Sequence, residues 1–330
     1  MTYPWQQTQW QQIKQLIKAG RLPHAMLLLG NRGLGKTDFA SSLANAVLCQ
    51  QPTADSQACG LCKSCRLLAA GSHPDLYHIA PTAPPDSKSK NPVKSIRIND
   101  IRELCDKLSQ TSQYGGYRVA ILEQAEQLTV SAANSLLKTL EEPGNNTLLL
   151  LVSARPHRLP VTIRSRCQQL RFSQPEAKVS LEWLQQNSQT QSTADQLQQA
   201  LRHTHGSPLA ALAFLREIEH HQLLSAAMTA GISAKNSLDY AEQLSKFPKI
   251  RTLEAMQSRV TDVCKLLACG VEADIINEPE RVKLQALANR VNEQRLFRFY
   301  DELNFNLLNS SISVNEQLLW ENLLISWDNL

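Results

Sequence analysis

The sequence predicts an α/β fold in which a parallel five-stranded sheet is built around a glycine-rich loop and is followed by two helical regions. First, residues 30–37 read Gly-Asn-Arg-Gly-Leu-Gly-Lys-Thr, which fits G-x-x-x-x-G-K-[ST] at every fixed position. Second, short apolar runs alternate with helical patterns over the first 172 residues. Third, residues 216–330 place their apolar side chains almost entirely at helical spacing.

The glycine-rich loop lies between a strand and a helix, which is the context that a phosphate-binding loop (P-loop) requires. The apolar run 26–29 precedes it, and a helical apolar pattern follows it. Glycines allow close backbone approach to phosphate, and the helix N-terminus adds positive potential. Lys36 is expected to reach the β- and γ-phosphates and Thr37 to bind Mg²⁺. An ordinary glycine-rich turn is the alternative. The residues predicted to hold nucleotide here are Gly30, Gly33, Gly35, Lys36 and Thr37.

Polar residues follow two of the remaining strand candidates at their carboxyl ends. Ser153 follows one strand, at the edge where open α/β sheets bind ligands. Glu123 follows another, where a P-loop ATPase carries a metal-binding acid. The next position is Gln124, whose amide cannot take a proton from water; Glu126 is the other acid nearby. These side chains are alternatively solvated residues at a strand–helix junction. The strand candidates are 76–79, 118–122, 147–152 and 168–172.

Four cysteines with the spacing C-x9-C-x2-C-x2-C predict a structural zinc module over residues 49–65. Two-residue gaps let neighbouring thiolates converge on one ion, and four sulfurs close a tetrahedral shell without a position for water. Disulfides and an iron–sulfur cluster are the alternatives. The predicted ligands are Cys49, Cys59, Cys62 and Cys65.

Length and composition are those of a globular chain of two or three domains. The chain has 330 residues, of which 42% are hydrophobic and 19% charged. Its net charge of +4 permits contact with nucleic acid but does not argue for it. The first twenty residues lack the apolar core of a signal peptide, and the run 148–152 is too short to span a bilayer. We therefore expect a cytoplasmic protein without a membrane partner.

Four stretches together resemble one known family. They are the loop 30–37, the cysteine quartet, the run Ala133-Asn-Ser-Leu-Leu-Lys-Thr-Leu-Glu-Glu-Pro143, and Ser165-Arg166-Cys167. In combination they resemble the bacterial sliding-clamp loader subunits of the AAA+ superfamily. The resemblance is specific over residues 20–172 and is one of architecture only beyond about residue 210. Gln124 stands where the gamma/tau motor subunits carry the second acid of an Asp-Glu pair. Leu209 ends a Gly-Ser-Pro-Leu run in which the motors carry a phosphate-sensing arginine.

The resemblance implies three domains and a role in DNA replication. An AAA+ domain (1–173) would precede a helical lid (174–213) and a helical collar (214–330) that joins subunits. The chain would be a stator of the DNA polymerase III clamp loader. It would sit in a hetero-pentameric ring with gamma/tau and delta subunits, which loads the sliding clamp onto primed DNA.

The resemblance also implies a role for one arginine and for the cofactors. Arg166 would serve as an arginine finger at a neighbouring motor's ATP site. Zinc would be structural, and Mg-ATP or Mg-ADP would be held without hydrolysis. Whether the chain is itself an enzyme stays open, because membership in a DNA-directed DNA polymerase requires no polymerase activity of this subunit. An active gamma/tau-type ATPase using Glu126, and a zinc-stabilised adaptor without a nucleotide role, are the alternatives.

Overall fold

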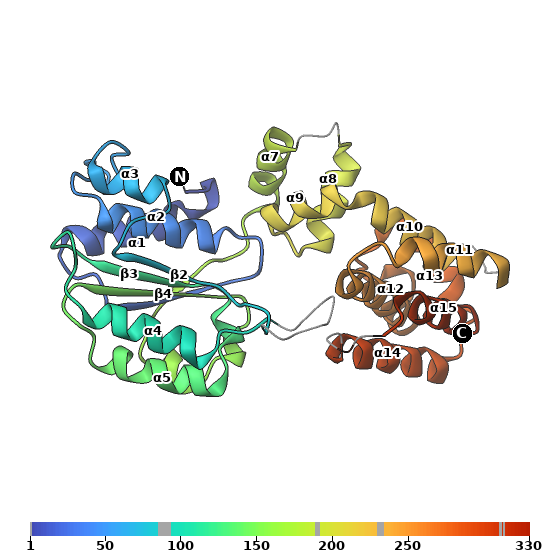
Figure 1. The fold of residues 1–330 in the computed structure, drawn as a ribbon. Coiled ribbons are helices and arrows are strands. Elements are labelled where there is room, and N and C mark those ends of the chain that lie inside the picture. Colours follow the sequence, from blue (N-terminus) through green and yellow to red (C-terminus); the bar gives the residue numbers. More distant parts are fainter. Residues whose placement is uncertain (1, 85–93, 189–191, 230–233, 310–311, 313) are drawn as a thin grey trace. The chain divides into compact units, whose positions relative to one another are not determined.

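The computed structural model describes the chain except for residues 1, 85–93, 189–191, 230–233, 310–311 and 313 (Figure 1). Its contacts divide the chain into two compact units. Of the residues that the structure describes, the first unit holds those up to 180 together with 207–210, and the second holds those in 181–206 and 211–330. Among the described residues, no helix is both long and apolar enough to cross a membrane.

The first unit contains the predicted five-stranded sheet, with strand order β2-β3-β4-β1-β5 and all neighbours parallel. The five predicted strands are confirmed to within one residue at each end. The central strands read as nearly continuous apolar runs because both of their faces are covered. The strands are β1 (Ala25–Leu29), β2 (Leu76–Ile79), β3 (Arg118–Leu122), β4 (Thr147–Ser153) and β5 (Gln168–Arg171).

Helices cover both faces of this sheet: α1 and α2 lie on one side and α4 and α5 on the other (Figure 1). Alternate residues of β1 face opposite ways, as the pleat requires. Met26 and Leu28 join the cluster that contains Phe39 of α2, whereas Leu27 joins the one that contains Leu136 of α5. The helices are α1 (Gln7–Lys18), α2 (Lys36–Leu48), α3 (Lys63–Ala69), α4 (Ile98–Ser109), α5 (Val130–Glu141) and α6 (Val161–Arg164).

From residue 177 onward the described chain forms helices, as the apolar periodicity predicts. One buried cluster gathers side chains of α7, α8 and α9, and a larger one gathers those of α10 to α15. The domain limits at 173/174 and 213/214 remain a proposal. The helices are α7 (Ala177–Asn187), α8 (Ala194–His203), α9 (Pro208–Arg216), α10 (Ile218–Thr229), α11 (Ala234–Leu244), α12 (Lys249–Cys269), α13 (Arg281–Ala288), α14 (Glu293–Leu308) and α15 (Glu316–Asp328).

A buried ion pair lies inside the second unit. Arg259 of α12 donates through Nε and Nη2 to the two carboxylate oxygens of Glu280, at 3.0 and 2.7 Å. Its remaining N–H groups reach the carbonyl oxygens of Ala255 and His221. Both side chains are almost fully buried, so the fork is enclosed but supplied with acceptors on every side.

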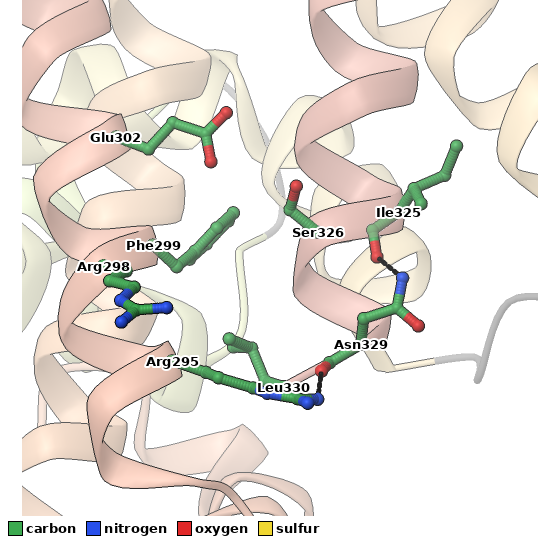
Figure 2. A pocket seen from close by; sticks show the side chains of 8 residues that line it. All are labelled: Arg295, Arg298, Phe299, Glu302, Ile325, Ser326, Asn329 and Leu330. Carbon is green, nitrogen blue, oxygen red and sulfur yellow. Dashed lines mark hydrogen bonds between the residues drawn. The ribbon is translucent and has the colours of Figure 1, made fainter.

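A pocket of about 310 Å³ opens between α14 and α15 (Figure 2). Arg295 crosses its lower edge and donates to the carbonyl oxygen of Asn329, whose own amide donates to the carbonyl oxygen of Ile325. None of the residues that the sequence predicts as functional lines this pocket. Its lining residues are Arg295, Arg298, Phe299, Glu302, Ile325, Ser326, Asn329 and Leu330.

Candidate nucleotide and metal sites

The glycine-rich loop connects the end of β1 to the start of α2, as predicted. Gly33 and Gly35 have φ angles of +77° and +74°, in the left-handed region that favours glycine. A Cβ atom on Gly33 would lie 2.5 Å from the Cβ and backbone nitrogen of Ala210. A Cβ atom on Gly35 would lie 2.4 Å from the ring of Tyr3. Both conformation and close packing therefore require glycine at these two positions.

Two segments from elsewhere in the first unit bind the backbone of this loop. Trp5 Nε1 donates to the carbonyl oxygen of Leu34, and Gln6 Nε2 donates to those of Leu34 and Gly35. On the other side, the backbone N–H of Leu209 donates to the carbonyl oxygen of Gly33 at 3.1 Å. Leu209, where the resemblance places the phosphate-sensing arginine of motor subunits, therefore contacts the loop, but only through its backbone N–H. Sequence patterns gave no sign of the contacts from Trp5 and Gln6.

The ammonium group of Lys36 is folded back onto its own loop. Nζ donates to the carbonyl oxygens of Gly30 and Asn31, at 2.7 and 2.6 Å. Burial lowers the pKa of Lys36 to about 8, although the carboxylate of Glu126 acts in the opposite direction. A phosphate bound in the loop would give this amine an anionic partner in place of the neutral carbonyl oxygens.

The fold brings the predicted polar residues to one edge of the sheet. Ser153 is the register partner of Leu29, which immediately precedes the loop. Glu123 directly follows β3, the strand on the other side of β4. Its carboxylate, however, lies 3.0 Å from Nε2 of His78 on the outer strand β2. Glu123 is thus available at the expected edge but already has a basic neighbour.

Glu126 is the acid whose charge acts on the ammonium group of Lys36. Its side chain is buried, and Oε1 accepts the backbone N–H of Ala154 at 3.3 Å. Oε2 has no partner within the described part of the chain. Gln124 is exposed with a φ of +47°, so it is Glu126 that turns inward. The interpretation of these side chains as solvated residues is therefore wrong for Glu126.

The lowered pKa of Lys36 makes nucleotide affinity depend on pH. Only the protonated amine attracts phosphate, so we expect the affinity for ADP to fall up to about tenfold per pH unit above about 8. The dissociation constant is to be measured by calorimetry in a series of buffers from neutral to alkaline pH. Lys36→Met should bind weakly throughout, without this slope. An affinity of the native chain that is flat across the series would contradict the assignment.

The four cysteines of the predicted zinc module converge. Their sulfur atoms all lie within 4.8 Å of one another. The Cys49–Cys62 and Cys59–Cys65 sulfur pairs are 3.9 Å apart, and the Cys65–Cys49 pair is 3.6 Å apart. A tetrahedral ion with metal–sulfur bonds of about 2.3 Å requires sulfurs about 3.8 Å apart. The donor set therefore has the size and chemistry of a closed zinc site.

Backbone donors and a buried histidine support this cluster. The N–H groups of Leu61 and Cys62 both point at the sulfur of Cys59, an arrangement that favours a thiolate. His73 is not a fifth ligand candidate, because its Nε2 lies 2.8 Å from Oγ of Ser64, which in turn donates to the carbonyl oxygen of Leu48. This chain of hydrogen bonds connects α3, which contains Cys65 of the cluster, to the end of α2.

Arg166 lies just beyond the short helix α6, on the surface. In an extended segment the side chains of Arg164 and Arg166, two residues apart, would point in the same direction. The expectation of an extended segment here is wrong, because Val161–Arg164 is helical and the N–H of Arg166 bonds to the carbonyl oxygen of Ile163. The two side chains differ, since Nε of Arg164 is buried. The guanidinium of Arg166 is exposed, 2.6 Å from a carboxylate oxygen of Glu141.

The parallel sheet carries a P-loop after β1, the fourth strand in the order of the sheet, and is followed by helices, which is the fold of a P-loop nucleotide-binding protein. Residues 5–176 match the family model "DNA polymerase III, delta subunit", and residues 218–329 match "DNA polymerase III, delta subunit, C terminal". The chain belongs to the DNA polymerase III subunit delta' family, which confirms the family resemblance of the sequence.

Individual relatives support this assignment. The chain is 32% identical to DNA polymerase III subunit delta' of Yersinia pestis over 337 residues, covering 99% of this chain and 95% of the relative. It is 44% identical to the subunit delta' of Pseudomonas aeruginosa over 211 residues, covering 63% of this chain and 60% of that protein. A gamma subunit-related protein of Thermotoga maritima shares the fold, with a TM-score of 0.51 at 18% identity over 97% of this chain and 99% of that one.

Proposed function

We propose that this chain is the stator of a DNA polymerase III clamp loader. It completes a hetero-pentameric ring with gamma/tau and delta subunits, and the ring loads the sliding clamp onto primed DNA. The names of its relatives, including a 38% identical tau subunit of Bacillus subtilis matched over 46% of this chain, support these partners. Within the ring, Arg166 serves a neighbouring motor subunit as an arginine finger.

One observation carries the stator assignment: the P-loop is complete while the groups that would drive hydrolysis are replaced. Gln124 is an exposed amide where an attacking water would need a base. Leu209 brings a backbone N–H to the loop where a motor would bring a guanidinium. The loop backbone is further engaged by Trp5 and Gln6. Such a site suits a subunit that holds nucleotide without turning it over.

The remaining parts take supporting roles in this proposal. Residues 1–173 form the AAA+ domain, 174–213 the lid, and 214–330 the collar through which subunits assemble. Mg-ATP or Mg-ADP lies on the P-loop, with Glu123 and Ser153 at the metal and phosphate edge. A zinc ion held by the four clustered cysteines stabilises the module 49–65 without taking part in catalysis.

Steady-state hydrolysis by the isolated chain tests the stator assignment. We expect weak binding of Mg-ATP and turnover near background, because no group is placed to activate water at position 124. Reconstitution with gamma/tau and delta should give a complex that loads clamps while this chain's own site stays silent. Turnover on the order of 1 per second, as working enzymes show, would contradict the proposal.

A gamma/tau-type ATPase is the second candidate, and the burial of Glu126 beside Lys36 favours it. In that case Glu126 would be the base, and Glu126→Gln would remove measurable turnover. The same substitution has no turnover to remove in a stator, so the pair of measurements separates the two functions.

A further inference from the structure

The end of α5 carries a charge in an unfavourable place. Glu141 is the last residue of this helix, where the backbone dipole is negative and an acid is disfavoured. Its neighbour Glu142 adds a second acid at the same end. Glu141 is distinguished by its partner: its Oε1 lies 2.6 Å from Nη2 of Arg166. The ion pair offsets the dipole for Glu141, and no such pair is present for Glu142 among the described residues.

The guanidinium of Arg166 is held at two points and open elsewhere. Nη2 meets Glu141, and Nη1 donates to the carbonyl oxygen of Thr162 at 2.9 Å. The Arg166 side chain keeps 36% of its surface exposed. Two anchors therefore fix the plane of the fork, while further N–H groups stay accessible to an anion. A long side chain fixed in this way loses less rotamer freedom when it meets its target.

The strength of the Arg166–Glu141 ion pair indicates whether Glu141 withholds the arginine from a phosphate or only orients it. An exposed ion pair shifts an equilibrium by a factor of about two to five, whereas a fork that meets a polyphosphate at an active site contributes about 10³–10⁵ in rate. Glu141 is too weak a competitor to keep Arg166 from a phosphate. It is strong enough to select one orientation of the free side chain.

We propose that Glu141 is a positioning residue, which presents the guanidinium of Arg166 in one orientation to the nucleotide of the neighbouring subunit. This inference rests on the proposed finger role of Arg166. Glu141 itself touches no substrate; it acts through the arginine, whose rotamer it limits together with the carbonyl oxygen of Thr162.

The test compares five variants in a reconstituted clamp loader with primed DNA and clamp. Glu141→Ala should lower the clamp-loading rate about two- to fivefold, the factor equivalent to one exposed ion pair. Glu141→Gln keeps an acceptor oxygen and should recover part of that loss. Glu142→Ala is the matched control, because it removes an acid from the same helix end without touching Arg166. The double variant Glu141→Ala/Arg166→Ala should be no slower than Arg166→Ala alone.

A second measurement reports on orientation without any turnover. In the isolated chain, ¹⁵N relaxation of the Arg166 Nε–H group should reveal faster motion in Glu141→Ala than in Glu142→Ala or the native chain. Equal motion in all three, or a Glu141→Ala complex that loads clamps as fast as the native one, would overturn the positioning role while leaving the finger intact. Native loading by Arg166→Ala would overturn the finger itself, and the positioning role with it.

Discussion

Arg166→Ala is expected to abolish the contribution of one arginine finger while the chain still folds and enters the ring. Hydrolysis at the motor site that receives this arginine should fall about 10³–10⁵-fold, because a guanidinium stabilises charge developing on the transferred phosphoryl group. Arg166 is exposed and bonded only at the surface, so its loss removes no core contact. Bulk ATPase should fall only in part, since other motor sites are untouched, and clamp loading should fall with it.

The comparison for this variant is Arg164→Ala, which removes the same charge two residues earlier in the same segment. Thermal unfolding and gel filtration of both complexes should confirm that each ring assembles. ATPase and clamp loading are then measured with primed DNA and clamp. Native rates in Arg166→Ala would reject the finger and leave a zinc-stabilised adaptor as the better description of the chain.

Removal of the metal should unfold the cysteine module. Structural zinc contributes about 10–16 kcal/mol of apparent binding free energy in small zinc modules, and this energy is available only to the folded site. We expect one zinc per chain, bound by four sulfurs at about 2.3 Å in X-ray absorption. After chelation, hydrogen exchange should accelerate over residues 49–65 and in α3, whereas α12, in the second unit, should keep its protection.

Two cysteine variants make this result specific to the cluster. Cys62→Ser removes a ligand, whereas Cys269→Ser replaces an exposed cysteine outside the cluster. Only the first should lose zinc and protection. Absorption bands of an iron–sulfur centre, or a well-folded preparation with no metal, would contradict the zinc assignment.

The sheet could be predicted from the sequence because its signals are local. The runs 119–122 and 148–152 are apolar throughout, as is typical of short strands that are covered on both faces. The P-loop is equally local, since its function depends on backbone conformation at fixed spacings. The cysteine quartet is spread over seventeen positions, but the ligand spacing carries the same information as a local motif.

The contacts that define the site could not be predicted in the same way. Trp5 and Gln6 bind the P-loop across about thirty residues of sequence, and no local rule distinguishes them from the glutamines and the tryptophan of α1, which follows them. The pairing of Arg166 with Glu141 depends on how α6 packs beside the end of α5. The position of Glu141 at the end of a helix is unfavourable for an acid, but the sequence does not identify Arg166 as its partner.

The buried ion pair Arg259–Glu280 limits which amino-acid substitutions these two positions can accept. Loss of either partner strands a charge in the core at a cost of about 3–5 kcal/mol, a large share of the stability of a typical domain. Exchange of both for well-packed apolar side chains costs far less. A single substitution at either position is therefore costly, so we expect the two charged residues to be kept together or replaced together, although 21 positions separate them in the sequence.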